Sequence, residues 1–497
     1  MSLDRDFVLT ALLQHNFLPA QKETREELPP VFSSTSFTPD VGRKLAVGKT
    51  RQKGGYDAVD YRLTRFSGVY RSCSIPHPVP YAKLALCIHE HWDKLDYITK
   101  SENSLIRPRE HKDGRLVIMD YENSSVNIRR NLALSYGKRF KVHTDITGCF
   151  PSIYSHAIPW ATVGFAHAKS HKPPAYVNEW FNQLDKCVRA IKRDETQGVA
   201  IGPATSNVVS EAILARVDEA LRPKFTFFRF IDDYTAYCET EDQAQEFIRE
   251  LSAELAKFKL LLNLKKTEVL PLPQPLSPDW LTELALRLPR SEEINGYEAV
   301  NFLNFAVSMA KNSPDGSVLK YAFKSVIGKK LDLAAKSKVL EYALTISFHQ
   351  PTLLPLLASL LTDAPDKKPF PYGEQLKSLA SENAKHRRSD GMAWTLHYLN
   401  RHKVVIEDAT ANMVVQTRDC IAMLLLYLSG DATHRQKVLD FANSLDLGDA
   451  YGLDEYWLLL YQLFFDGRIA NVHPNEDGFD ILKNSGVSFI QDLAPDF

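Results

Sequence analysis

Several features that would mark a membrane protein, a disulfide-stabilised scaffold or a disordered chain are missing from this sequence. The six cysteines among 497 residues form no CxxC pair, so neither a disulfide framework nor a structural zinc site is expected. Gly (22) and Pro (27) are ordinary for this length, which excludes collagen-like and mostly disordered chains. The longest apolar run, Ile421–Leu428, is far shorter than the roughly 18–20 residues that span a bilayer.

Signals for export and for two common enzyme classes are also lacking. The first residues, MSLDRDFVLTALLQHNF, place acids before a short apolar stretch and contain no small-residue cleavage site, which argues against a secretory signal. There is no GxxxxGKS or GxxxxGKT loop of the P-loop type, and no GxSxG elbow of the serine hydrolases. The sequence predicts a cytoplasmic protein with reduced thiols and no membrane contact.

Charge is unevenly distributed, although the net charge is only −1. Residues 1–330 carry 45 Lys and Arg against 39 Asp and Glu, whereas residues 331–497 carry 15 against 22. A chain that coats nucleic acid along its whole length would be far more basic. The distribution therefore favours a local basic groove in the first part of the chain.

Strand-like and helix-like segments alternate in the first part, in an order that is typical of a small sheet with helices on one face. The expected elements are a strand at Phe140–Ile146, a helix at Val208–Leu221, a strand pair at Phe225–Ile231 and Tyr234–Cys238, a helix after Thr240, and a strand at Leu260–Leu270. Thr240 and Gln243 have the spacing of a capping box, which marks the start of the second helix.

The chain changes character after a Pro-rich connector at residues 271–290. Phe302–Ser308 is expected to form a last strand pair before a turn at Pro314–Gly316. Helical stretches follow, at Val339–Ser347, Thr352–Leu361, Met392–Leu399, Thr417–Leu428 and Glu455–Phe465. We expect an α+β domain at residues 1–309, with its central motifs at about 140–309, and an all-helical domain of HEAT-like helix pairs at residues 310–497.

Three aspartates carry the clearest chemical signal. Asp232 and Asp233 stand between two strand-like segments, where a divalent cation such as Mg²⁺ would cancel the repulsion between adjacent carboxylates. A solvated turn is the alternative explanation for this pair taken alone. Asp145 ends a separate strand, and neighbouring strands would bring it beside Asp232. Two cations about 3.5–4 Å apart would then activate an attacking 3′ oxygen and neutralise a leaving pyrophosphate.

The order of these acids resembles the palm of reverse transcriptases over about residues 70–310. The corresponding segments are Asp145 (motif A), Gly202 with Ser206 (motif B), Phe230–Asp233 (motif C) and Leu262–Thr267 (motif D). Two further segments, Ser74–Pro78 and Ser155–Trp160, resemble the abortive-infection (Abi) reverse transcriptases of bacteria and prophages. The helical second part agrees with that group, which carries a helical region where other reverse transcriptases have a thumb.

The resemblance implies a metal site and an acid catalyst. Asp145, Asp232 and Asp233 would hold the cations, together with the backbone carbonyl of Ile146. Lys266 matches the motif D lysine and would donate a proton to the leaving pyrophosphate. Mg²⁺ is the expected cofactor of this two-metal site, with Mn²⁺ as a substitute.

The resemblance also implies a set of nucleotide contacts. Phe150 stands at the position of the steric gate, where its ring would clash with a ribose 2′-OH. Gly202 would let the backbone approach the nucleotide, and Ser206 follows at the spacing that motif B requires. Lys112 and Arg115 belong to a basic turn similar to the fingers hairpin of this family, and they would hold the triphosphate.

Two positions depart from the family pattern. Ala200–Ile201 replaces the usual Pro-Gln before Gly202, so the Gln amide that helps to hold the nucleotide and the template is absent. The primer-grip segment Phe302–Phe305 has Asn304 where Gly is usual. The missing amide puts ordinary templating geometry in doubt.

Membership of the Abi group would imply an unusual polymerase for anti-phage defence in the bacterial cytoplasm. It would polymerise dNTPs without a template, start from a protein hydroxyl such as Tyr56 or Tyr61, keep its single-stranded DNA product covalently attached, and form homo-oligomers. The helical region would pack against the palm, in the space of a thumb. Two alternatives stay open: a conventional template-copying reverse transcriptase of the retron-like kind, and a non-catalytic nucleic-acid-binding scaffold.

Overall fold

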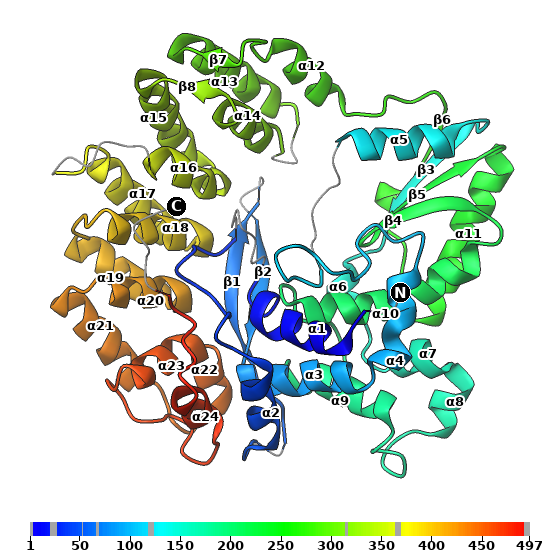
Figure 1. Ribbon diagram of the computed structural model, residues 1–497, viewed down its shortest axis with the longest axis horizontal. Helices are drawn as coiled ribbons and strands as arrows, with labels where there is room; N and C mark the ends of the chain where they lie inside the picture. The colour runs from blue at the N-terminus through cyan, green and yellow to red at the C-terminus, as the bar shows by residue number, and fades with distance from the viewer. Residues whose placement is uncertain are drawn as a thin grey trace.

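The structure is a computed structural model that describes residues 3–19, 27–51, 53–65, 69–117, 124–313, 317–362 and 369–491. Figure 1 shows a mixed part built around a β-sheet and a series of helices that follow one another in an arc from α12 (Asp279–Arg287) to α24 (Gly478–Asn484). The hairpin of β1 (Ala58–Thr64) and β2 (Tyr70–Pro76) lies between these two parts. Within the described ranges, every helix is too short or too polar to cross a membrane.

The elements before and around the sheet are mostly short. Those that precede the sheet are α1 (Arg5–Thr10), η1 (Ala11–His15), α2 (Pro39–Val47), β1, β2, α3 (Pro78–Glu90), α4 (Trp92–Leu95), η2 (Asp96–Lys100) and α5 (Ser124–Ser135). Those between its first and second strands are α6 (Cys149–Ser152), α7 (Ala157–Val163), α8 (Phe165–Ser170), α9 (Trp180–Ala190) and α10 (Ala204–Leu221).

The sheet has four antiparallel strands in the order β4-β5-β3-β6. Its members are β3 (Phe140–Asp145), β4 (Thr226–Phe230), β5 (Asp233–Cys238) and β6 (Glu268–Pro271), with α11 (Glu241–Lys257) and η3 (Leu264–Lys266) between the last two. In the central strand β3, the register with β5 runs from Phe140↔Cys238 to Asp145↔Asp233. The expected order of strand, helix, hairpin, helix and strand is confirmed, although regular pairing in the last segment begins only at Glu268.

Local sequence explains the start and the buried face of α11. The Thr240 side chain accepts a hydrogen bond from the Gln243 N–H at 3.1 Å, which confirms the predicted N-cap. The side chain of Gln243 turns back to accept from the Glu239 N–H at 2.8 Å, one residue earlier than in a standard capping box. Phe247 and Leu251 belong to the apolar stripe that packs this helix into the core.

The expected strand pair at Phe302–Ser308 is wrong, because these residues lie inside α13 (Gly296–Ala310). Asn295 and Glu298 form a reciprocal capping box at the start of this helix, with hydrogen bonds of 2.9–3.0 Å. The buried residues Ala299, Phe302, Leu303, Ala306 and Ala310 recur at helical spacing. Since α12 lies within the expected connector and packs on α13, the helical part starts before residue 310. The expected turn at Pro314–Gly316 lies outside the described residues.

The rest of the second part is mostly helical, but the short parallel pair of Glu293–Ile294 with Lys330–Leu331 departs from the expected all-helical domain. Its elements are β7 (Glu293–Ile294), α14 (Ser317–Ile327), β8 (Lys330–Leu331), α15 (Leu333–His349), η4 (Pro351–Leu356), α16 (Leu357–Thr362), α17 (Gly373–Lys385), α18 (Ser389–Arg401), α19 (Asp408–Thr417), α20 (Cys420–Leu428), α21 (Ala432–Asn443), α22 (Ala450–Asp454), α23 (Trp457–Phe465) and α24. Consecutive helices such as α17 and α18 pack against each other, and so do α20 and α21.

The helical part and the N-terminal segments share one hydrophobic core. The ring of Phe17 lies 5.5 Å from that of Phe489 and 6.1 Å from that of Trp457, between centroids. The Ser33 N–H donates to the Phe489 carbonyl at 2.9 Å, and β1 packs on α18, α20 and α23. Among the described residues, the helical part therefore packs mainly on the N-terminal segments and the β1–β2 hairpin.

Candidate active site

The three aspartates lie together at one end of the four-stranded sheet. Asp145 is the last residue of β3, and it is paired directly with Asp233, the first residue of β5. Asp232 lies in the two-residue turn between β4 and β5, and its carbonyl accepts a hydrogen bond from the Ile146 N–H at 3.2 Å. The turn and the end of β3 are thus joined through the backbone, which brings together the acids that the sequence predicts.

The turn that presents Asp232 is strained and is held by a buried cation. Ile231 has a φ of 57°, a left-handed conformation that is rare for a β-branched residue. The Arg229 guanidinium donates to the Ile231 carbonyl at 2.7 Å. Arg229 is itself fully buried and is paired with Glu211 at 2.7 Å and Asp218 at 2.8 Å, both on α10. A buried ion network therefore fixes the turn against α10.

Sequence reasoning missed this network, because each member looks ordinary by itself. Arg229 alternates with aromatic residues in β4, and Glu211 and Asp218 are two of several polar residues in α10. The spacing of seven residues from Glu211 to Asp218 places both on one face of the helix. The one signal for this network in the sequence was an arginine, Arg229, among the aromatic residues of the strand that leads into the motif C turn.

The electrostatics of the acids favour a bound cation. Burial, reinforced by the charges of Asp233 and Asp145, raises the pKa of Asp232 to about 6. Burial and the charge of Asp145 also raise the pKa of Asp233. Asp145 is only 5% exposed, and its Oδ1 is buried without a hydrogen-bond partner among the described residues. An unpaired buried carboxylate oxygen beside two other carboxylates fits the oxygen ligands that Mg²⁺ prefers.

Lys266 lies beside these acids. Its Nζ donates to Asp145 Oδ2 at 2.6 Å, and this bond, with the other acids adding to it, raises the pKa of Lys266. The Asn263 N–H also donates to the Asp145 carbonyl at 2.9 Å, so the segment before Lys266 runs along the end of β3. The structure thus brings the motif D lysine into contact with the motif A aspartate.

The motif B and gate residues lie on the α10 side of the acids. Gly202 has a φ of +130°, and a Cβ there would lie 3.0 Å from the Ser74 carbonyl oxygen, so its backbone is packed against β2. Ser206 is buried in the first turn of α10. Phe150 lies in α6, is 6% exposed, and accepts a backbone hydrogen bond from Val199 at 3.0 Å. In this conformation the Phe150 ring is largely part of the core.

The basic turn places its two cations differently. Lys112 is exposed, whereas Arg115 is 6% exposed and pairs with Asp113 at 2.6 Å. Arg115 is thus neutralised inside its own hairpin. Asn16, which sequence reasoning did not single out, joins this hairpin to α10, because its Oδ1 accepts from the Leu116 N–H and its carbonyl accepts from the Ala204 N–H.

Arg71, on β2, is a cation that sequence reasoning missed. Its charge lowers the pKa of Asp232, against the larger upward effects of burial and Asp233. Because β1–β2 is an antiparallel hairpin with a register from Ala58↔Pro76 to Thr64↔Tyr70, Arg71 is held on a regular strand. Local sequence offered no signal for this role, because the hairpin brings Arg71 near Asp232.

A groove of about 760 Å³ lies between α5 and the open face of the sheet. Its lining includes the cations Arg130, Lys138 and Lys141, the acid Asp233, and the aromatic residues Phe228, Phe230 and Tyr237. Basic side chains next to aromatic rings are the combination that binds single nucleic-acid strands. The groove agrees with the local basic track that the charge distribution favours.

Comparison with known proteins shows what part of this chain resembles. Residues 98–305 match the family model of the reverse transcriptase (RNA-dependent DNA polymerase), and the matched segment holds all three aspartates and Lys266. Residues 98–305 are thus similar to a reverse transcriptase domain. Such a domain is that of a nucleotidyltransferase, which acts on nucleotides and nucleic acid and generally uses divalent cations such as Mg²⁺. No curated protein matches the chain.

Three of the solved structures that are similar to this chain are telomerases. An apo telomerase from Candida tropicalis, truncated from its C-terminal domain, shares 13% identity at a TM-score of 0.32, over 48% of this chain and 55% of its own. The apo telomerase from Candida tropicalis without this truncation shares 11% identity at a TM-score of 0.32, over 82% of this chain and 73% of its own. Telomerase from Candida albicans, in complex with a fragment of telomeric RNA, shares 10% identity at a TM-score of 0.31, over 82% of this chain and 68% of its own. The chain spans about half the length of the first of these structures.

Proposed function

We propose that this chain polymerises dNTPs in a metal-dependent reaction at the end of the four-stranded sheet. The observation that supports this most strongly is the direct pairing of Asp145 with Asp233, with Asp232 in the adjoining turn, inside a reverse transcriptase domain. Catalysis of this kind consists mainly of positioning and charge stabilisation, so a few well-placed carboxylates suffice.

The proposed roles follow from the contacts of each residue. Asp145, Asp232 and Asp233, with the Ile146 carbonyl, would hold the cations. Bound Mg²⁺ would supply activation of the attacking 3′ oxygen and neutralisation of the leaving pyrophosphate. Lys266 would leave Asp145 Oδ2 when that oxygen becomes a ligand, and its ammonium would then be free to protonate the pyrophosphate.

The nucleotide would lie between the acids and the β1–β2 hairpin. Arg71 is the cation best placed for the triphosphate, because its charge already acts on Asp232. Lys112 would add a second, mobile charge, and Arg115 would have to leave Asp113 to take part. The proposed gate role of Phe150 requires the edge of its buried ring to face the sugar, next to the backbone of Gly202 and the first turn of α10, which carries Ser206.

We further propose that the chain is an anti-phage enzyme of the Abi group, a homo-oligomer in the bacterial cytoplasm that builds DNA without a template from a protein hydroxyl, beside a helical region of HEAT-like pairs. The missing motif B glutamine and the basic, aromatic groove support a single-strand product.

Tyr56 and Tyr61 are poor candidate primers, because both side chains are buried. The Tyr56 hydroxyl donates a hydrogen bond to Glu476, and the Tyr61 hydroxyl donates one to the Glu27 carbonyl. Tyr70 and Tyr136 are exposed.

The test is an incorporation assay on the purified full-length chain with labelled dNTPs and Mg²⁺, with and without added RNA and DNA templates. We expect labelled DNA without any template, and we expect the label to run with the protein until protease is added. Product that appears only with a template, and whose sequence follows it, would instead establish the template-copying alternative. Absence of product under all conditions would leave the scaffold alternative.

A further inference from the structure

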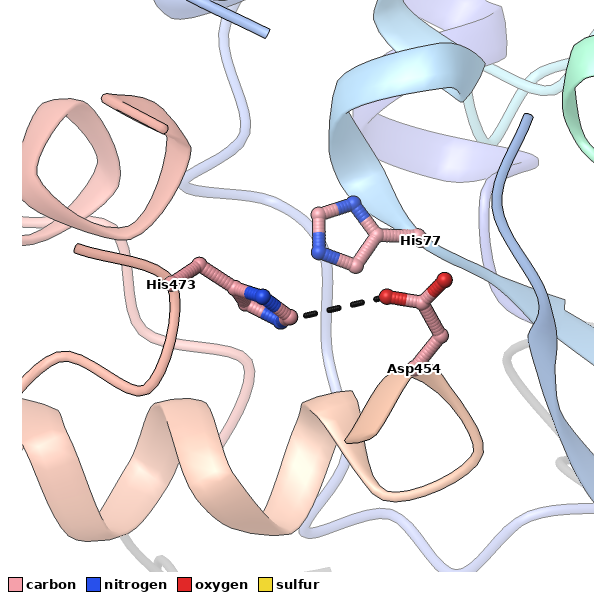
Figure 2. Close-up of side chains that lie close together, drawn as sticks. All are labelled: His77, Asp454 and His473. Atoms are coloured by element: carbon pink, nitrogen blue, oxygen red, sulfur yellow. Dashed lines mark ion pairs between the residues drawn. The ribbon is translucent and has the colours of Figure 1, made fainter. Parts of the chain in front are cut away.

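A second cluster of ligand-type side chains lies where the last helices meet the N-terminal segments, well apart in sequence from the polymerase acids. Figure 2 shows His77, Asp454 and His473 pointing toward one another. His77 is the N-cap of α3, Asp454 ends α22, and His473 precedes α24. One nitrogen from each histidine and one carboxylate oxygen all lie within 4.8 Å of one another.

Two nitrogens in this cluster are buried with nothing to bind. The exposed fractions are 1% for His77, 0% for Asp454 and 8% for His473. His77 Nδ1 accepts from the Val79 N–H at 3.4 Å, but the Nε2 atoms of both histidines lack hydrogen-bond partners among the described residues. The dashed line in Figure 2 joins His473 Nε2 and Asp454 Oδ1 at 3.8 Å, which is too long for a hydrogen bond. Buried polar atoms are normally satisfied, so both nitrogens need an explanation.

The surroundings hold the rings in place. The His77 ring stacks on Tyr56 at 4.7 Å and on Phe479 at 5.8 Å, between centroids. The His473 ring meets the edge of the same Phe479 at 5.5 Å. These contacts orient both imidazoles before any ligand arrives, which lowers the cost of ordering a site.

The local charge favours a cation. Asp454 accepts from the Arg51 guanidinium at 2.8 and 3.0 Å, and Glu476 pairs with the same arginine at 3.4 Å. Asp454 and Glu476 thus supply two carboxylates beside the histidines, with the Arg51 guanidinium between them.

We propose that His77, Asp454 and His473 bind a structural Zn²⁺ ion that fastens the C-terminal helices to the N-terminal segments. Two imidazole nitrogens and one carboxylate oxygen are a zinc ligand set in which a water molecule takes the fourth position of the tetrahedron. The sequence contains no CxxC pair, and for that reason it predicted that no structural zinc site is present. The lack of such pairs excludes only sites whose ligands are cysteines close together in sequence. These ligands come from segments almost four hundred residues apart, so only the fold brings them together.

Metal content of the full-length protein is the first test. The chain is stripped with a chelator, reloaded with Zn²⁺, dialysed and analysed by mass spectrometry. We expect about one zinc per chain for the wild type and at least a tenfold lower content for His473→Gln. His434→Gln is the matched control, because His434 is also buried but lies in α21, outside the cluster; it should keep its zinc. Asp232→Asn should keep it too, which separates this site from the polymerase acids.

Stability and spectroscopy provide readouts that do not depend on a variant folding. Adding Zn²⁺ at about 100 times its Kd to the stripped wild type should raise the Tm by about 3 °C. X-ray absorption should show nitrogen and oxygen ligands at about 2.0–2.1 Å and no sulfur. A wild type that retains no zinc and shows no shift in Tm would overturn the proposal, as would wild-type zinc content in His473→Gln. Stoichiometric iron in place of zinc in the protein as purified, before it is stripped, would overturn the choice of metal.

Discussion

Asp232→Asn should lower dNTP incorporation by at least about 10³-fold while the protein stays folded, because the substitution removes a ligand charge from the centre of the reaction. The same change should stabilise the metal-free protein at neutral pH. The pKa of Asp232 is raised to about 6 in the folded chain, so its ionisation costs folding free energy as the pH rises from about 4 to above 6. Asn does not ionise, so the variant does not lose this free energy of folding. The gain in stability over the wild type should therefore be absent below about pH 4, where Asp232 is protonated in both the folded and the unfolded chain.

The measurements are an incorporation assay with Mg²⁺ and urea unfolding with a chelator at pH 4 and at pH 7.5. Asp242→Asn is the control, because Asp242 is exposed in the first turn of α11 and the substitution makes the same chemical change. Wild-type incorporation by a folded Asp232→Asn protein would contradict the assignment of the acids. Loss of stability at neutral pH would contradict the account of their mutual repulsion.

Arg229→Met should lower the free energy of unfolding by about 3–5 kcal/mol, because it leaves Glu211 and Asp218 buried without their cation. It should also reduce incorporation, since the hydrogen bond that holds the Ile231 carbonyl is lost and the turn carrying Asp232 is released. Arg229 is a positioning residue, and it touches the reaction only through this turn.

Urea unfolding followed by circular dichroism measures the effect on stability. Arg222→Met, at the end of α10, is the matched control: Arg222 is half-exposed and lies 3.9 Å from Glu102, so its loss should change stability by less than about 0.5 kcal/mol. An unfolding midpoint of Arg229→Met equal to that of the wild type would show that the buried network does not support the turn.

Local pattern was sufficient where one element carries its own signal. The strand before Asp145, the hairpin around Asp232 and the cap at Thr240 were all predicted, because alternation, charge at a turn and capping chemistry act over a few residues. The segment Phe302–Ser308 failed because it was interpreted without Asn295 and Glu298, whose capping box starts a helix six residues earlier.

Features made by tertiary contact could not be predicted in this way. Arg115 looked like a free cation, but the fold buries its side chain, where it pairs with Asp113 of its own hairpin. Arg71 was overlooked because the β1–β2 hairpin, and not local sequence, brings its charge near Asp232. The core in which Phe17 and Phe489 join the two ends of the chain likewise could not be predicted from local sequence.

The most direct test of the central claim is anomalous X-ray diffraction from crystals of the chain grown with Mn²⁺ and a non-hydrolysable dNTP. The account predicts two anomalous peaks about 3.5–4 Å apart between Asp145 and Asp232, with Lys266 moved away from Asp145 Oδ2. Crystals that hold the nucleotide but show no Mn²⁺ at these carboxylates, with Lys266 still bound to Asp145, would contradict it.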